Sequence, residues 1–414
     1  MKLTIFRLFC LIAFFMFMFV GYVSVIKLTS VGLLVQYHIE EFVRAGKPLF
    51  IQVQPKCKPV KKIVYMKTHQ TGSTTLAAIL DRFAYNNQLT LPIYQGVTDH
   101  VPFRRSMVAN QGKLDMLTSH TLYNKAEMDI AFPGAVYITI AREPSSHFES
   151  VFTYFGLAKR IYEPDPKMAI DDFLHEPSRY LTYSRSPFNR VWNGQMQEFG
   201  LKKHEFNDNK RVQQKIKELD LEFDLVLITE YFDESMILLK DFLCWNFEDV
   251  VYMSMNVRSE RSILSKDSKR KIRSLSKADV AFYNHFNKTF WDKIHKKGKK
   301  FQKDLSEFKR IKKEYLALCL TNETTIKLHR INVSTNMNKL QAGLSADEAQ
   351  ETCGSLKKNH LEWSAIINDR MLKNGLVSYE TFKQIKENSK KSKTAKQSAH
   401  NPVVRRLAIP KLTD

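Results

Sequence analysis

The hydrophobic positions of the chain form one long apolar segment and then several short runs separated by polar loops. The long segment, residues 8–26 (LFCLIAFFMFMFVGYVSVI), carries no charged side chain and is long enough to cross a bilayer as a helix. Lys2 and Arg7 precede it, which favours a cytosolic N-terminus. The alternative is a cleaved signal peptide, but the run is longer than a typical signal core and no clear small-x-small cleavage site follows. We therefore expect a cytosolic tail over residues 1–7, an uncleaved anchor over 8–26 and a body in the secretory lumen.

The short apolar runs after the anchor predict buried strands, and each run is followed by apolar residues at helical spacing. Strands that alternate with helices in this way imply a parallel sheet with helices on both faces. The expected fold is therefore α/β, with a central parallel sheet flanked by helices. The predicted strands are residues 63–66 (IVYM), 113–119, 135–141 (AVYITIA) and 222–229, and the predicted helices begin near Ser73, Ser145 and Asp233.

The remaining segments lack this alternation. Residues 157–187 contain several prolines and aromatic residues, which predict an irregular insertion beside a substrate cleft. Residues 262–318 are strongly basic and predict helices with a solvated basic face, which we favour over a nucleic-acid-binding surface. Residues 387–414 are rich in Lys and Ser and predict a disordered tail. With a stem over residues 27–60, the expected luminal domain spans residues 61–386.

The loop after the first predicted strand is the chain's clearest candidate for anion binding. It reads KTHQTGSTT over residues 67–75 and leads into the helix that begins near Ser73. Unpaired amides and the positive end of the helix dipole point at this position, and the loop adds hydroxyls and the Lys67 cation. The alternative is a capped helix that simply follows a core strand. A nucleoside-triphosphatase loop is excluded, because Ser73 follows Gly72 where GxxxxGK[ST] requires Lys.

Composition and acceptor motifs agree with a secretory address and an anionic partner. There are 64 Lys and Arg against 43 Asp and Glu, a net charge of +21, which favours anionic ligands. Four of the five cysteines follow the anchor, so one or two disulfides are expected, in any of three pairings; they are Cys57, Cys244, Cys319 and Cys353. The predicted N-glycosylation acceptors are Asn287, Asn322 and Asn332. Neither CxxC nor a Cys/His cluster occurs in the sequence, so we expect no metal site.

A second anion-binding position is predicted at the end of the 135–141 strand. Arg142 follows that strand directly, and Ser150 lies eight residues later, about two helical turns on. Both side chains can therefore face one ligand, and the forked guanidinium of Arg suits a phosphate. The alternative is an Arg paired with Glu143 or another acid. Two anion loops on neighbouring strands suit a nucleotide with phosphates on both its 5′ and 3′ sides.

Four ordered segments resemble the galactose-3-O-sulfotransferase family, which includes the galactosylceramide sulfotransferases. They are KTHQTGSTT (67–75), AREPSSHFES (141–150), NGQMQEFG (193–200) and residues 223–252. The similarity runs through residues 61–256 and is thinner beyond. The resemblance implies a P-loop-like sulfotransferase fold in a single-pass type II membrane protein of the Golgi, with a luminal catalytic domain and no nucleic-acid partner.

The resemblance also implies the ligands. The donor would be 3′-phosphoadenosine-5′-phosphosulfate (PAPS), and the acceptor would be the 3-hydroxyl of a terminal β-galactose on a glycolipid or glycoprotein. Arg142 and Ser150 would hold the 3′-phosphate, and Asn193 and Gly194 are acceptor candidates by position. The 5′-phosphosulfate would be held by Lys67, Thr68, His69, Gln70, Thr71, Gly72, Ser73, Thr74 and Thr75.

Three residues are candidates for the chemistry. His120, at the end of the 113–119 strand, is the candidate base by resemblance; His69 is its rival, although its place in the loop fits donor contact better. One departure from the family matters: the family loop reads KTHKTG, whereas this chain has Gln70 in place of the second Lys. Gln donates a hydrogen bond but carries no charge. Either Lys67 replaces the missing cation or catalysis is reduced.

Three functions remain open at this level. The first is sulfuryl transfer to galactose. The second keeps PAPS but uses a glycosaminoglycan acceptor, which the basic helices favour. The third is a catalytically impaired luminal protein that binds nucleotide or glycan, and Gln70 is its only support.

Overall fold

The computed structural model describes most of the chain between residues 57 and 378. Within this span, residues 97, 99–100, 113, 162–164, 182–189, 255–263 and 321–345 are not described, while 380, 383 and 387 are. The chain divides into two compact units. One unit comprises residues 55–313 and 355–414 and contains the sheet; the other comprises residues 1–54 and 314–354.

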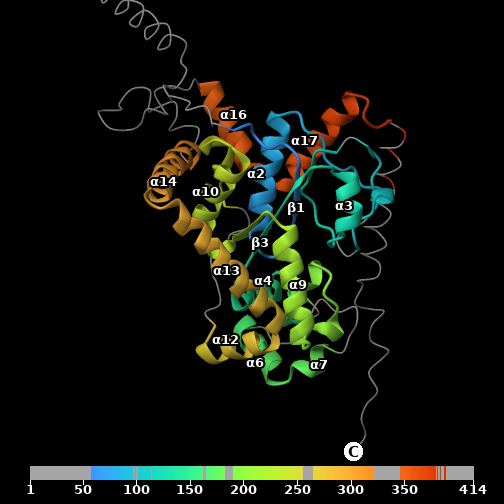
Figure 1. The fold of residues 1–414 in the computed structure, drawn as a ribbon, viewed down its shortest axis with the longest axis vertical. Helices are drawn as coiled ribbons and strands as arrows, with labels where there is room; N and C mark the ends of the chain where they lie inside the picture. Colours follow the sequence, from blue (N-terminus) through green and yellow to red (C-terminus); the bar gives the residue numbers. More distant parts are fainter. Residues whose placement is uncertain are drawn as a thin grey trace, which may run out of the picture. The chain divides into compact units, whose positions relative to one another are not determined.

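The described elements alternate as the sequence predicts, with four strands set among many helices (Figure 1). The strands are β1 (Ile63–Met66), β2 (Met116–Leu117), β3 (Val136–Ala141) and β4 (Leu225–Ile228). The helices up to β4 are α2 (Ser73–Asn86), α3 (Lys125–Ala131), α4 (Pro144–Tyr154), α5 (Ala158–Ile161), α6 (Pro166–His175), α7 (Pro177–Leu181), α8 (Gly194–Glu198) and α9 (Asn209–Glu222). After β4 come α10 (Phe232–Leu243), α11 (Phe247–Val250), α12 (Lys266–Leu275), α13 (Lys277–Lys297), α14 (Lys299–Leu320), α16 (Ala346–Lys357) and α17 (His360–Lys373). Three short 3₁₀ turns are η1 (Arg105–Met107), η3 (Lys203–Glu205) and η4 (Thr229–Tyr231).

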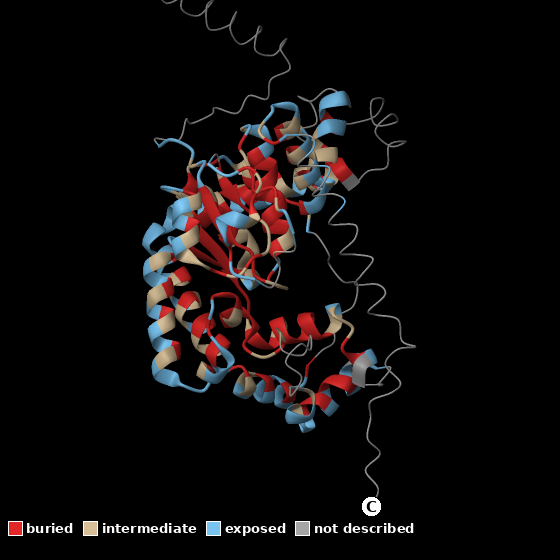
Figure 2. Cartoon of the chain, turned by 90° about the vertical axis from the view of Figure 1, so that its right-hand side faces the viewer, coloured by how far each residue is buried: buried red, intermediate tan, exposed pale blue. Residues whose placement is uncertain are grey.

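The four strands form one parallel sheet in the order β2-β1-β3-β4. β1 and β3 are central, and nearly every residue in the strands is buried, as the red arrows of Figure 2 show. Because all four strands run in the same direction, their carboxyl ends lie along the same end of the sheet, called the carboxyl edge below. That edge places the segments after β1, β2, β3 and β4 next to each other.

Helices cover the sheet because strands buried on both faces need apolar partners there. α10 and α13 pack against β4, and α17 packs against α2. A buried carboxylate joins α2 to the segment after β2 and to α17. Asp81 of α2 accepts hydrogen bonds from Thr118 (2.6 Å) and from His360 Nδ1 (2.5 Å). The expected α/β fold with a central parallel sheet flanked by helices is therefore confirmed.

Two helix starts at the carboxyl edge follow from local sequence. α2 begins after Gly72, whose φ of +72° favours glycine and whose added Cβ would meet Phe232 at 3.3 Å. α4 begins with Pro144 in its first turn, where a missing N–H costs nothing. The Glu143 carboxylate caps α4 by accepting from the amides of Ser145 and Ser146.

The structure corrects two expectations about elements. The strand predicted over residues 113–119 is only two residues long, because β2 is an edge strand that pairs only at Met116 and Leu117. The segment 157–187, predicted to be irregular, contains α5, α6 and α7 among its described residues. Its prolines misled the prediction: Pro166 and Pro177 open helices instead of breaking them.

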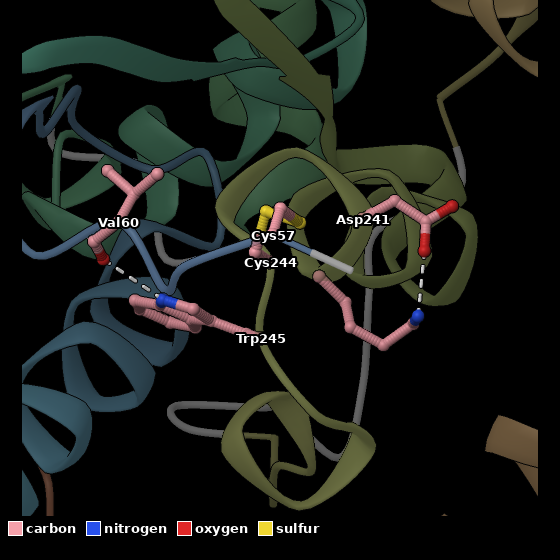
Figure 3. Close-up of a disulfide and its surroundings, with 6 residues drawn as sticks. Cys57, Val60, Asp241, Cys244 and Trp245 are labelled. Carbon is pink, nitrogen blue, oxygen red and sulfur yellow. Dashed lines mark hydrogen bonds and ion pairs between the residues drawn. A yellow bond between two sulfur atoms is a disulfide. The ribbon is translucent and has the colours of Figure 1, made fainter. Parts of the chain in front are cut away.

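Two disulfides pair all four cysteines that follow residue 26. Cys57 pairs with Cys244 (Cα–Cα 5.9 Å), and Cys319 pairs with Cys353 (5.2 Å). Figure 3 shows the first, where α10 ends; beside it the indole N–H of Trp245 donates to the Val60 carbonyl at 3.1 Å. This cross-link ties the segment before β1 to the last turn of α10.

Several predictions fall on residues that the structure does not describe. They are the cytosolic tail and anchor, the stem up to residue 56, Asn322, Asn332 and the tail beyond 387. None of the helices in the described residues is long and apolar enough to cross a membrane. Asn287 is described: it lies in the middle of α13, and its Oδ1 is buried. Asn287 as a whole is half-buried, and its role as an acceptor stays a prediction.

Candidate functional site

The loop between β1 and α2 is braced from three sides and keeps one face open. The Thr68 hydroxyl donates to the Ile140 carbonyl of β3 (3.0 Å), and Thr71 Oγ1 lies 3.2 Å from the Thr68 carbonyl. Thr229 Oγ1 contacts the Thr71 carbonyl at 2.7 Å. Both loop threonines are buried and their hydroxyls hold the loop, and Lys67 beside them is also buried, with 3% of its surface exposed. By contrast, the open side is formed by His69, Gln70, Gly72 and Thr74, while Ser73 and Thr75 are buried.

Lys67 and His120 come together at the carboxyl ends of β1 and β2. His120 Nδ1 lies 2.8 Å from the Lys67 carbonyl, which can only accept, so Nδ1 carries the proton. The remaining nitrogen, Nε2, therefore presents a lone pair, and it accepts from the Lys67 ammonium at 2.8 Å. These two contacts favour the neutral tautomer of His120 with the proton on Nδ1, in which Nε2 carries the lone pair that a general base needs.

His69 lies against His120 and is held by a carboxylate from α8. The two imidazole rings stack with centroids 4.0 Å apart and an interplanar angle of 16°. His69 Nδ1 forms a short hydrogen bond with Glu198, whose carboxylate also accepts from the His69 amide at 3.1 and 3.2 Å. Glu198 is buried and comes from the last position of α8. The order of groups is thus Glu198, His69, His120 and Lys67.

The same groups do not have the geometry of a metal site. Ligand-type atoms of His69, His120 and Glu198 lie within 4.8 Å of one another. An imidazole binds a metal ion through a lone pair in its ring plane. Two nearly parallel stacked rings direct their lone pairs side by side and not to one point, and the Lys67 ammonium lies on His120 Nε2. The arrangement therefore fits two stacked histidines, each hydrogen-bonded to another residue, better than it fits a metal centre.

Arg142 and Ser150 meet at Gln70, so the structure brings the two predicted anion positions together. Arg142 Nη1 donates to the Gln70 carbonyl at 2.7 Å, and the Ser150 hydroxyl donates to Gln70 Oε1 at 2.9 Å. Gln70 has a φ of +57°, a left-handed conformation that is uncommon outside glycine. Glu143 accepts from Arg273 at 2.6 Å and caps α4.

His147 is buried beneath the loop and was not singled out by the sequence. Its Nε2 lies 3.0 Å from the His69 carbonyl and therefore donates to it. Burial, with the neighbouring Arg142 charge as a second cause, lowers the pKa of His147 to about 3. His147 is thus a neutral donor that fixes the peptide of His69.

Asn193 and Gly194 support the site and do not line it. Both are buried; Asn193 Oδ1 accepts from the Asp279 amide (3.1 Å), and an added Cβ on Gly194 would meet His147 at 3.2 Å. In return, the Asp279 carboxylate accepts from the Met196 amide at 2.9 Å. Burial raises the pKa of Asp279 to about 7. The position of these two residues in the sequence suggested acceptor contact, but their burial places them under the loop.

Two buried groups give the site opposite responses to acid. The folded pKa of His147 lies below its usual value of 6.5, so its contribution to stability is present above pH 6.5 and is lost as the pH falls toward 3. The folded pKa of Asp279 lies above its usual value of 3.8, so its contribution is present below pH 3.8 and is lost as the pH rises through 7. Between pH 7 and pH 5 the two changes are each about 2 kcal/mol and nearly cancel.

Substituting either residue should reveal the pH dependence of stability that the other one causes. From pH 7 to pH 5, Asp279→Asn should lose about 2 kcal/mol of unfolding free energy relative to wild type, and His147→Gln should gain about 2 kcal/mol. Urea unfolding of the full-length protein at both pH values measures this slope, whatever the stability of each variant at pH 7. Parallel slopes in all three proteins would contradict the assignment of these two groups.

The fold and the site define the class as α/β, with a loop that enters a helix at the carboxyl ends of the parallel strands, where ligands bind in such sheets. Comparison with known proteins makes the class specific. The profile of the family described as Galactose-3-O-sulfotransferase matches residues 10–348. The chain belongs to the galactose-3-O-sulfotransferase family.

Curated relatives agree with this membership. The chain is 34% identical over 277 residues to galactosylceramide sulfotransferase of Mus musculus, an alignment that covers 64% of this chain and 65% of the relative. It is 30% identical over 304 residues to galactose-3-O-sulfotransferase 2 of Mus musculus (69% and 76%). It is 28% identical over 284 residues to galactose-3-O-sulfotransferase 3 of Homo sapiens (64% and 64%). The match to the first of these therefore spans less than two thirds of the relative's length.

Proposed function

We propose that the protein transfers a sulfuryl group from PAPS to the 3-hydroxyl of a terminal β-galactose on a glycolipid or glycoprotein. Two findings support this proposal: membership of the family and the names of the relatives, which are sulfotransferases of galactose and galactosylceramide. The single observation that carries it is the pair of Lys67 and neutral His120 beside the open face of the helix-start loop. We also propose the Golgi lumen as its location, behind an anchor at residues 8–26 with type II orientation.

The loop fits a phosphosulfate. The N-terminus of α2 has no side-chain cap, so its first amides suit an anion, and the helix dipole favours negative charge there. Lys67 would place a cation at the phosphate end of the donor. Arg142 and Ser150, which both reach Gln70, would hold the 3′-phosphate on the neighbouring strand.

The proposed reaction needs one base and one cation. When the Lys67 ammonium moves from Nε2 of His120 to the donor's phosphate, the Nε2 lone pair is released. Nε2 then takes the proton of the galactose 3-hydroxyl as that oxygen bonds to sulfur, and the bond between sulfur and the 5′-phosphate oxygen breaks. The negative charge that develops on the departing phosphate is stabilised by the Lys67 ammonium and the α2 amides. The products are the galactose 3-sulfate and adenosine 3′,5′-bisphosphate, with the proton on His120.

A glycosaminoglycan is the competing acceptor because exposed cations gather on α12 and α14. They include Lys266, Lys269, Arg270, Lys271, Lys299, Lys300, Lys303, Lys309 and Arg310. These lysines and arginines favour a polyanionic chain over a neutral sugar. Their solvated position accounts for them without any ligand, so galactose remains the primary proposal.

The test is transfer of labelled sulfate by the full-length protein. We would incubate it with ³⁵S-labelled PAPS and galactosylceramide, free β-galactosides, heparan or chondroitin, and map the label on the sugar. Label on the galactose 3-position supports the proposal. Label found only on glycosaminoglycan chains would mean that the acceptor is a glycosaminoglycan and not a terminal galactose. Binding of adenosine 3′,5′-bisphosphate without any transfer overturns the enzyme proposal.

Gln70→Lys tests whether the missing family lysine limits the rate. Gln70 accepts from Ser150, and a lysine there would add a cation on the same side of the loop. Because one transition-state donor is worth on the order of 100- to 1000-fold in rate, we expect turnover to rise, by up to that factor. Initial rates with saturating PAPS measure the change, with Gln88→Lys, another left-handed glutamine, as the matched control. An unchanged or lower turnover would count against the idea.

A further inference from the structure

Two stacked histidines in the site have partners of opposite charge. His69 Nδ1 is bonded to the Glu198 carboxylate, whereas His120 Nε2 is bonded to the Lys67 ammonium. The rings themselves lie 4.0 Å apart. The sequence reasoning left open which histidine acts as the base, and Glu198 was not among its candidates.

The charges around each ring favour different protonation states. A carboxylate in contact stabilises the imidazolium form of His69, while an ammonium in contact stabilises the neutral form of His120. Two stacked imidazolium rings at 4.0 Å would also repel each other. Other charged or titratable groups around the loop include Arg142 and His147, and His147 is held neutral by burial. Asp279 and Tyr65 are buried nearby, and the Glu198 charge contributes to raising the pKa of each. Glu198 is therefore the group that selects His69 as the ring to carry a proton on both nitrogens.

We propose that Glu198 is a positioning residue that assigns different roles to the two histidines, holding His69 as a charged donor and leaving His120 as the neutral base. With Nδ1 on Glu198, His69 would donate from its Nε2–H to the anionic sulfuryl group or its phosphate. This charged donor lies one residue from Gln70 and supplies part of the positive charge that a lysine at position 70 would add. The inference rests on the proposed sulfuryl transfer for its kinetic consequence, but not for the charge of His69.

Glu198 also holds the loop mechanically, because its carboxylate accepts the His69 amide. A purely structural role would alter stability and both Michaelis parameters, but it would not move a titration. The decisive variant is Glu198→Gln, which keeps the size and one acceptor oxygen. It removes the charge and puts an amide N–H₂ where a carboxylate oxygen accepts now.

The first measurement uses the ligand-free, full-length protein labelled with ¹³C at histidine Cε1. His69→Gln identifies the His69 signal among those of the 12 histidines. In wild type we expect His69 to be charged at pH 7 and His120 to be neutral. In Glu198→Gln we expect the His69 titration midpoint to fall by about one pH unit or more, since a lost ionic partner shifts a titration by 1–3 units. A midpoint that does not move, or a neutral His69 in wild type, overturns the proposal.

The second measurement is the pH dependence of sulfate transfer. The alkaline limb of the kcat profile, where His69 loses its proton, should move to lower pH in Glu198→Gln. Turnover at pH 7 should fall by about 10- to 100-fold, the usual cost of removing a group that orients a reacting one. Glu205→Gln, which removes a surface carboxylate bonded to Arg211, is the matched control and should change neither quantity.

The two measurements test the role of Glu198 and the proposed sulfuryl transfer separately. If wild type transfers no sulfate while the His69 titration shifts as expected, the role of Glu198 stands and the proposed function fails. If wild type is active but the alkaline limb of Glu198→Gln coincides with that of wild type, the role of Glu198 is refuted and the function stands.

Discussion

His120→Ala should lower the turnover of sulfate transfer by about 100- to 10,000-fold, the range that a positioned general base contributes. The reason lies in which ring nitrogen of His120 can accept a proton. Nδ1 is committed to the Lys67 carbonyl, so only Nε2 can take a proton, and in alanine that atom is missing. Initial rates at saturating donor and acceptor measure the loss, and the KM for PAPS should change much less than kcat.

Two controls decide whether this loss is chemical. His204 is exposed on η3, so His204→Ala should keep the wild-type rate. Binding of adenosine 3′,5′-bisphosphate to His120→Ala, measured by calorimetry, should persist, because the loop is braced by Thr68, Thr71 and Thr229 and not by His120 alone. A variant that binds this nucleotide and still turns over at more than a tenth of the wild-type rate would remove His120 from the role of base.

Much of the fold could be predicted because its signals are local. A continuous apolar run such as Ile63–Met66 or Val136–Ala141 is a property of consecutive residues, and both strands appear where the pattern places them. Pro144 and Gly72 likewise mark helix starts by backbone chemistry alone. The errors came where context decides: an edge strand needs only two paired residues, and proline opens a helix as readily as it ends one.

The site was less predictable for a physical reason. Lys67, His120 and Arg142 follow strands, so the shared carboxyl edge of a parallel sheet brings them together and the sequence pattern finds them. Glu198 and His147 reach the loop from α8 and α4, and nothing local in the sequence marks either contact. The one available signal was the position of Glu198 inside the family segment 193–200, which suggested acceptor contact at Asn193 instead.

Arg142→Ala should weaken the binding of adenosine 3′,5′-bisphosphate by about 10- to 100-fold, because a charge-assisted hydrogen bond to phosphate is worth about 1.5–3 kcal/mol. The loss should depend on the 3′-phosphate. Adenosine 5′-phosphate lacks that group, so its weaker affinity should change little in the variant. Calorimetric titration of wild type and variant with both nucleotides forms a cycle, and its coupling free energy reports the contact between Arg142 and the 3′-phosphate.

The cycle also separates a direct contact from an indirect one. Arg142 Nη1 donates to the Gln70 carbonyl, so alanine could loosen the loop and weaken both nucleotides equally. Equal losses would mean that Arg142 shapes the 5′ loop and that the 3′-phosphate is bound elsewhere. Ser150→Ala refines the result: the Ser150 hydroxyl donates to the Gln70 side chain, and a neutral hydrogen bond is worth about 0.5–1.5 kcal/mol. A smaller loss than that of Arg142→Ala, again confined to the bisphosphate, would place both residues on one phosphate and so fix the direction in which the donor lies across β1 and β3.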